Sequence, residues 1–111
     1  KRKDELLYQF ITLVESNFRK HRDVIFYANR LRVSSKHLSS IVKIVSGRTA
    51  GEWIDSYVIL EAKMMLRNTA MSIQEVGAAL SFSDQSFFGK YFKRLTGNSP
   101  REYRQLNLTT K

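Results

Sequence analysis

The fold is decided by the stretch from Ser72 to Arg104, which has the sequence SIQEVGAALSFSDQSFFGKYFKRLTGNSPREYR. Ser72 and Glu75 have the spacing of a capping box, in which the hydroxyl accepts from a free N–H of the first helical turn and the carboxylate accepts from the N-cap N–H. This box predicts a short helix over about 73–80.

A longer helix is predicted directly after it, over about 84–96, because apolar residues recur there at helical spacing. We expect Ser83 to be its N-cap and Gly97 to end it. A short helix, a four-residue turn and a longer helix form the plan of a helix-turn-helix, whose second helix enters the major groove of DNA.

The chain repeats this unit at an offset of 49–50 residues. Leu31-Arg32-Val33-Ser34 matches Leu80-Ser81-Phe82-Ser83, and Thr49-x-x-Glu52-Trp53 matches Ser99-x-x-Glu102-Tyr103. Each copy has a small residue inside its first helix, Ala28 or Gly77, which lets the two helices approach closely. Two units are too few for a helical solenoid, so the repeat predicts two helix-turn-helix lobes.

The whole chain is therefore expected to be all-α, a seven-helix domain with two helix-turn-helix lobes joined by a long central helix. Helical spacing predicts the remaining helices over about 4–20, 24–31, 35–46 and 50–68, and from Pro100 onward. Within a domain spanning 1–111, the first lobe covers about 4–48, the linker helix about 50–68 and the second lobe about 72–106. On the two longer helices of the lobes, we expect Val45 and Leu95 to face the core with their apolar neighbours.

The amino-acid composition limits the classes of function that this protein can have. The 111 residues carry 19 Lys and Arg against 10 Asp and Glu, a formal net charge of +9, and 42% are hydrophobic. A folded protein this basic is expected to bind a polyanion, with nucleic acid as the first possibility. The absence of Cys excludes disulfide scaffolds and thiolate metal sites. No apolar run is long enough to span a membrane.

An enzyme is not expected, and neither is a cofactor or a metal. The acids are scattered, and the two His are sixteen residues apart without a metal-ligand pattern. Two other classes stay open. A helical protein-interaction module would explain the amphipathic helices, and a nonspecific nucleoid-type DNA binder would suit serines at base-contacting positions.

The stretch from Ser72 to Arg104 resembles, over some thirty positions, the signature of the arabinose-regulator (AraC-type) transcription factor family. The segment Tyr27-Ala28…Leu31…Val33-Ser34…Leu38-Ser39…Lys43…Gly47 resembles the family's first helix-turn-helix. Together the resemblance covers about 20–106.

The resemblance implies a DNA-binding domain of a bacterial transcription regulator, usually a promoter activator. Its two recognition helices, about 35–46 and 84–96, would enter successive major-groove segments. Double-stranded promoter DNA and RNA polymerase are the implied partners, and the location is the cytoplasm, on the nucleoid. Family members mostly carry an N-terminal sensing or dimerisation region, which the start at Lys1 leads us to expect in a longer whole protein.

Four positions depart from the family pattern. Arg32 and Ser81 stand in the turns where relatives often have Gly, which would cost about 1 kcal/mol each if φ is positive. Gly77 replaces a usual Ala and should loosen its helix by up to about 1 kcal/mol. Ser40 stands where many relatives have a base-contacting Arg.

The outer faces of the recognition helices supply the expected DNA contacts, in agreement with the family's contact positions. The expected base-contacting residues are Lys36, Ser39, Ser40, Gln85, Ser86, Gly89 and Lys90. The expected phosphate contacts, from side chains and helix N-termini, are Ser35, Lys43, Arg48, Thr49, Ser72, Ile73, Lys93 and Arg94.

The two recognition helices are expected to make different contributions to DNA binding. Gln85 can bond bidentately to adenine, and Lys90 can donate to guanine O6 and N7. The serines of the first recognition helix discriminate bases poorly, so that helix should mainly position the protein.

Three further roles follow from position along the helices. Asp84 is expected to be a first-turn residue that interacts with the helix dipole. Phe87 either rims the core or touches a thymine methyl. Arg104 either binds phosphate or, preferably, holds the closing helix through an acid.

Overall fold

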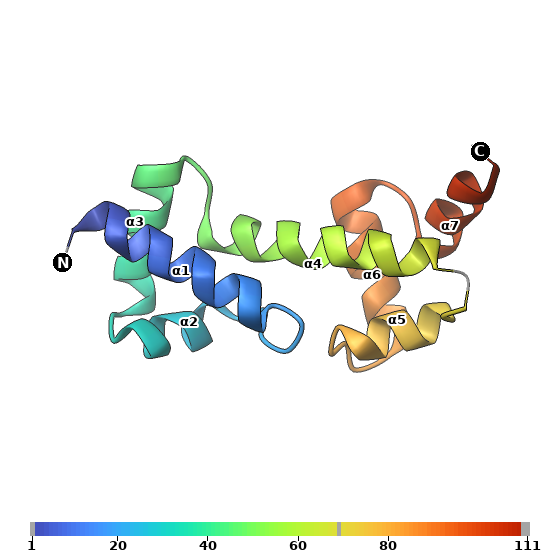
Figure 1. Cartoon of the computed structure of the whole chain (residues 1–111), viewed down its shortest axis with the longest axis horizontal. Helices are drawn as coiled ribbons and strands as arrows, with labels where there is room; N and C mark the ends of the chain where they lie inside the picture. Colours follow the sequence, from blue (N-terminus) through green and yellow to red (C-terminus); the bar gives the residue numbers. More distant parts are fainter. Residues whose placement is uncertain (1, 69, 110–111) are drawn as a thin grey trace. The chain divides into compact units, whose positions relative to one another are not determined.

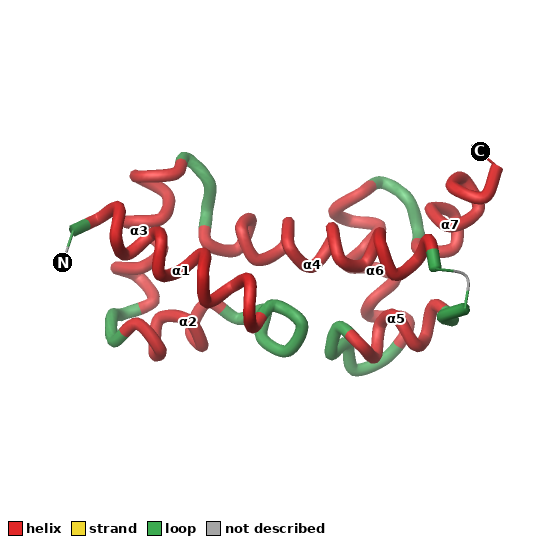
Figure 2. Tube along the Cα trace, in the orientation of Figure 1, coloured by secondary structure: helices red, strands yellow, loops and turns green. Residues whose placement is uncertain are grey.

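The computed structural model describes residues 2–68 and 70–109, and these residues form seven helices with no strand among them (Figures 1 and 2). The helices are α1 (Lys3–Asn17), α2 (Val24–Leu31), α3 (Ser35–Ser46), α4 (Ala50–Arg67), α5 (Ile73–Ala79), α6 (Gln85–Thr96) and α7 (Pro100–Thr109). The predicted all-α class and the order of the helices are confirmed. The ends of the expected 1–111 domain lie partly outside the described residues.

The described residues fall into two compact units that divide between Tyr57 and Val58, inside α4. Unit 1 holds α1, α2, α3 and the first half of α4, whereas unit 2 holds the rest of α4 with α5, α6 and α7. Each unit therefore contains one helix-turn-helix pair, α2–α3 or α5–α6 (Figure 1).

The end of α1 and the N-cap of α6 differ from the sequence prediction, and α4 and α5 each end one residue before the expected position. Helix α1 ends at Asn17 rather than near residue 20. The chain continues as a turn, in which the Asn17 carbonyl accepts from the N–H groups of both Lys20 at 3.1 Å and His21 at 2.9 Å. Helix α6 begins at Gln85, and its N-cap is Asp84, not Ser83. The Asp84 carboxylate accepts from the N–H of Phe87 at 2.7 Å, because a short side chain at the N-cap reaches a free donor of the first turn.

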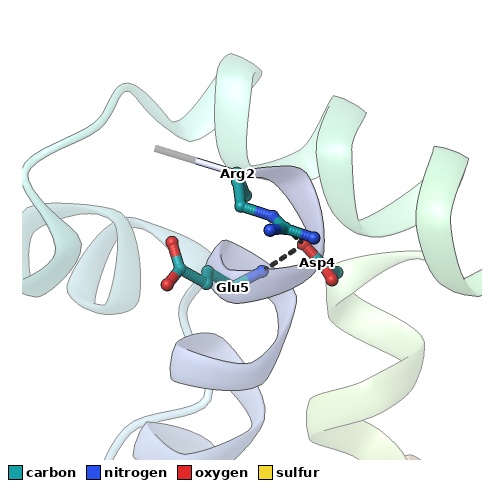
Figure 3. A network of polar contacts seen from close by, with 3 residues as sticks. All are labelled: Arg2, Asp4 and Glu5. Atoms are coloured by element: carbon teal, nitrogen blue, oxygen red, sulfur yellow. Dashed lines mark hydrogen bonds and ion pairs between the residues drawn. The ribbon is translucent and has the colours of Figure 1, made fainter.

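Figure 3 shows the polar contacts at the start of α1. The Asp4 carboxylate accepts from the N–H of Glu5 at 3.1 Å and lies 3.6 Å from the Arg2 guanidinium. Both partners of this ion pair are exposed, so its contribution to stability is small.

The core of unit 1 is built around Tyr27 and Phe10, which are fully buried with their rings edge to face at 5.7 Å. The Tyr27 hydroxyl donates to the carbonyl of His21 at 2.7 Å. Burial raises the pKa of Tyr27 to about 12, because the phenolate would lose its solvation. This one side chain thus joins α2 to the α1–α2 connection and to the apolar core.

The core of unit 2 combines an aromatic cluster with buried aliphatic residues of α4 and α5 and of the turn that follows α5. Phe82, Phe88, Tyr91 and Phe92 are buried, and the Phe82 ring lies 5.1 Å from that of Phe88 and 5.0 Å from that of Tyr91. Two residues that the sequence places in the core are partly exposed: Leu95 of α6 is 37% exposed, and Val45 of α3 is 38% exposed. Each of these two residues lies in the last turn of its helix.

Both helix-turn-helix turns contain a residue in the left-handed region. Arg32 has φ of 59° and Ser81 has φ of 67°, so both positions meet the condition, a positive φ, under which the sequence predicts a cost. Gly47 and Gly97 end α3 and α6 with φ of 80° and 88°, as predicted for a C-terminal glycine.

Candidate nucleic-acid interface

The first helix-turn-helix is closed by backbone bonds around Ala28. Its carbonyl accepts from the N–H of Val33 at 3.1 Å, while the left-handed Arg32 caps α2. The hydroxyl of Ser34 then accepts from the N–H of His37 at 3.0 Å and starts α3, as expected for its N-cap. These bonds fix the angle at which α3 leaves the turn.

The outer face of α3 is polar and exposed. Lys36, Ser39 and Ser40 are exposed together on it, and Ser35 is half-buried at the start of the helix. Lys43 is also exposed, but its Nζ donates to the carbonyl of Gly47 at 3.1 Å. Because an ammonium group has three donors, this bond leaves two of them for a phosphate contact.

The second helix-turn-helix repeats the same closure. The Gly77 carbonyl accepts from the N–H of Phe82 at 2.9 Å, in the place of the Ala28–Val33 bond. A Cβ on Gly77 would lie 3.1 Å from the Cβ of Phe88, so the close approach predicted for the small residue is confirmed here.

The outer face of α6 brings the other expected base-contacting residues together. Gln85, Ser86 and Lys90 are exposed, and Gly89 is half-buried. Gln85 and Gly89 also line a groove of about 240 Å³. The other residues that line this groove belong to the N-terminal ends of α5 and α7: Ile73, Ser99, Pro100 and Arg101.

The expected phosphate-binding arginines are exposed, yet each is held by an aromatic ring. The guanidinium of Arg48 lies 4.6 Å from the centre of the Trp53 ring, and its Nη2 donates to the Glu52 carbonyl at 3.2 Å. Arg94 lies 5.5 Å from the centre of the Tyr91 ring. Cation–π contact restricts these side chains while leaving guanidinium donors for an anion. Lys93 is exposed on the outer face of α6.

All three predicted capping boxes form. The hydroxyls of Thr49, Ser72 and Ser99 each accept from the N–H three residues later, and Glu52, Glu75 and Glu102 each accept from the N-cap N–H at 2.8 Å. Thr49 and Ser72 are exposed at the starts of α4 and α5, and Ile73 is half-buried. Each box satisfies two of the N–H groups that a helix start leaves without an intrahelical partner, the one of the N-cap residue and the one three residues later.

Two of these boxes change the acidity of their Glu. The bond from the Thr49 N–H lowers the pKa of Glu52, with smaller contributions from the Thr49 hydroxyl, Lys43 and Arg48. The bond from the Ser99 N–H likewise lowers the pKa of Glu102, aided by Lys93. In each case the partner favours the charged carboxylate.

Sequence reasoning missed a repeated hydroxyl link after each recognition helix. The Ser46 hydroxyl donates to the Val42 carbonyl and accepts from the N–H of Arg48, and Thr96 makes the same two bonds fifty residues later. The signal was available, because a hydroxyl residue precedes both Gly47 and Gly97. These links connect the end of each recognition helix to the start of the next helix.

The role of Arg104 is corrected in its detail. Its guanidinium bonds three carbonyls, those of Leu66 at 2.7 Å, Met71 at 2.6 Å and Asn68 at 3.3 Å, rather than an acid. These carbonyls lie at and after the end of α4, where helix carbonyls lack intrahelical partners. Arg104 therefore holds α7 to the α4–α5 connection.

Comparisons with known proteins agree with this geometry. A family model described as a helix-turn-helix domain matches residues 27–106. The chain is 35% identical over 92 residues to the arabinose operon regulatory protein of Escherichia coli (strain K12), covering 83% of this chain and 30% of that protein. The same regulator from Salmonella typhimurium (strain LT2) is 34% identical over 84 residues, 76% of this chain and 30% of that protein.

Solved structures show the same fold. The C-terminal domain of AraT, a response regulator from Geobacillus stearothermophilus, matches with a TM-score of 0.85 at 23% identity, over 96% of this chain and 88% of that one. The DNA-binding domain of AdpA, solved with a target DNA, matches with a TM-score of 0.78 at 22% identity, over 90% of each chain.

The chain spans about 30% of the length of the first two curated relatives. Across residues 2–68 and 70–109, none of the helices is long and apolar enough to cross a membrane.

Proposed function

Because the chain belongs to the AraC-type helix-turn-helix family of transcription regulators, we propose that it binds double-stranded promoter DNA sequence-specifically. In this proposal α3 and α6 enter adjacent segments of the major groove. The family consists of DNA-binding regulators, not enzymes.

One observation carries the proposal: the recognition helix of each unit has an exposed polar face and contains no acid. Within α3 the charged residues are Lys36 and Lys43, and within α6 they are Lys90, Lys93 and Arg94. An outer face without carboxylates can approach phosphates without repulsion, and its amide, hydroxyl and ammonium groups can bond base edges.

We assign sequence preference mainly to α6. Gln85 would bond adenine N6 and N7, and Lys90 would bond guanine O6 and N7, with Ser86 and Gly89 allowing close approach between them. On α3, Lys36, Ser39 and Ser40 would make less selective contacts and fix the position of the protein.

The phosphate contacts would flank these helices. Lys43, Arg48, Lys93 and Arg94 would supply side-chain donors, joined by Ser35. The helix starts marked by Thr49 on α4 and by Ser72 and Ile73 on α5 would supply the backbone N–H groups that their capping boxes leave free. The aromatic contacts of Arg48 and Arg94 support this role, because a restricted guanidinium loses less freedom when it binds phosphate.

The wider role is proposed from the family. Relatives include proteins described as transcriptional activators, so we propose promoter activation with RNA polymerase as a further partner. The site of action would be nucleoid DNA in the bacterial cytoplasm. A sensing or dimerisation region elsewhere in the whole protein would control binding.

The proposal is tested by selecting sites from random double-stranded DNA and measuring affinity for them across salt concentrations. We expect a log–log salt slope of about −5 to −8, at about 0.9 per neutralised phosphate. A scrambled duplex of equal length is the control. Absence of salt-sensitive DNA binding would refute the proposal, and equal affinity for selected and scrambled duplexes would favour a nonspecific nucleoid-type binder.

A further inference from the structure

Phe87 is a large apolar side chain left 48% exposed in the first turn of α6. Its N–H donates to the Asp84 carboxylate, so the backbone at this residue is fixed by the helix cap. In helix-turn-helix proteins the N-terminal residues of the recognition helix contact base edges. In the proposed complex, Phe87 therefore lies in the part of α6 that would come closest to the bases.

The exposed ring contacts Phe82, a residue of the turn between α5 and α6. The Phe87 ring lies 5.4 Å from that of Phe82 at an interplanar angle of 70°, an edge-to-face contact. Phe82 is only 6% exposed and packs against Phe88 and Tyr91, so it gives Phe87 a rigid support. A ring that is supported by a buried neighbour and is still 48% exposed can make apolar contact with a ligand without a large loss of conformational freedom.

Phe87 also lies next to an expected base-contacting residue. Residues three apart on a helix are surface neighbours, so Phe87 adjoins the exposed Lys90. The matching position in α3, fifty residues earlier, is His37, which is exposed but polar. An exposed apolar ring at this place is therefore a feature of the second unit and not of the repeat.

We propose that Phe87 is a specificity-determining residue that contacts the C5-methyl group of a thymine next to the base pair bonded by Lys90. The thymine methyl is the apolar group that the major groove presents, and Phe is one of the side chains that contact it. This inference rests on the proposed function. It adds an apolar preference to the hydrogen-bonding preferences of Gln85 and Lys90.

The test replaces each thymine of a selected site, one at a time, with deoxyuridine, which removes only the methyl group. With the unchanged protein, we expect one position in the part of the site bound by α6 to bind about fourfold more weakly, the effect of losing one buried methyl-sized group. With Phe87→Ala, thymine and uracil at that position should bind equally. The free-energy costs of removing the methyl group and of removing the ring should not add, because both changes remove the same contact.

The matched control is Leu60→Ala, which removes a similarly exposed apolar side chain from α4. This variant should keep the full thymine preference, and circular dichroism tests whether both variants fold. An unchanged thymine preference in Phe87→Ala, or no preference in the unchanged protein, would overturn the inference while leaving DNA binding in place. Failure to bind any selected site would instead overturn the proposed function and this inference with it.

Discussion

Gly77 of α5 lies directly against Phe88 of α6, so that a Cβ added to Gly77 would be 3.1 Å from the Phe88 Cβ and 3.2 Å from its Cγ. The corresponding residues of unit 1 are Ala28 and Leu38, both buried. Compared with unit 1, unit 2 has the smaller Gly77 in place of Ala28 and the larger Phe88 in place of Leu38. Gly77 is therefore matched to Phe88, and its effect on helix propensity is only part of its role.

The first prediction concerns this pair. We expect Gly77→Ala to destabilise the protein by about 1 kcal/mol, because overpacking against the buried Phe88 costs more than the gain in helix propensity. Urea unfolding measures the change. Adding Phe88→Leu recreates the pair found in unit 1, so the double variant should be more stable than the sum of the two single changes predicts. Simple additivity would show that the two side chains do not interact.

The second prediction concerns the turns. Arg32 and Ser81 have positive φ, so Arg32→Gly and Ser81→Gly should each raise the free energy of unfolding by about 0.5–1 kcal/mol. Arg32→Ala is the matched control, since it removes the side chain but keeps the Cβ strain. Equal effects of Gly and Ala at residue 32 would contradict the backbone explanation.

The third prediction separates specificity from general affinity. Gln85→Ala and Lys90→Ala should each cost about 1–3 kcal/mol on the selected site and much less on random DNA. Lys93→Ala should weaken binding to both duplexes similarly and reduce the salt slope by about 1. Fluorescence anisotropy at several salt concentrations measures both quantities. Equal losses on the two duplexes for Gln85→Ala and Lys90→Ala would move their role to phosphate binding.

The fourth prediction distinguishes two arginines of α7. Arg104→Ala should lower the free energy of unfolding by about 2–3 kcal/mol, because charge-assisted bonds to three carbonyls are lost. Arg101→Ala changes an exposed residue, so its effect on unfolding should stay within about 0.5 kcal/mol. A similar loss of stability in both variants would show that α7 depends on charge rather than on the carbonyl bonds.

The fifth prediction follows from the acidity of Glu52 and Glu102, whose pKa values are lowered from 4.5 in the folded protein. A lowered pKa stabilises the folded state above the ordinary pKa, and this stabilisation is lost as the pH falls below about 4.5 through the lowered values. The double variant Glu52→Gln/Glu102→Gln should therefore lose less stability than the unchanged protein between pH 5 and pH 3. Parallel urea midpoints for the two proteins over this range would contradict the prediction.

Most of the fold could be predicted from the sequence because its signals are local. Capping boxes, glycine stops and apolar spacing depend on residues within one or two helical turns, and they placed α2 to α5 within about one residue. The wrong N-cap of α6 has a local cause too. Ser83 and Asp84 are both good caps, and only the backbone conformation after the turn decides between them.

Contacts between distant residues could not be predicted in the same way. The three carbonyls bonded by Arg104 lie more than thirty residues away, and no side-chain pattern marks a backbone acceptor. The link between Gly77 and Phe88 was foreseen as a close approach, but not as an exchange of volume between two helices. The DNA contacts stay predictions, since they depend on a partner outside the chain.

The duplication has a consequence for the DNA itself. The four expected base-contacting residues of α6 each have a counterpart in α3 fifty residues earlier, and the residues differ in every pair. Three pairs join expected base contacts, namely Lys36 and Ser86, Ser39 and Gly89, and Ser40 and Lys90, whereas the counterpart of Gln85 is Ser35, an expected phosphate contact. Two such unlike surfaces in one chain favour two unlike half-sites in a fixed order. A single molecule would then sit on its site with a defined polarity, so inverting the site at a promoter would turn the protein around rather than leave it equivalent.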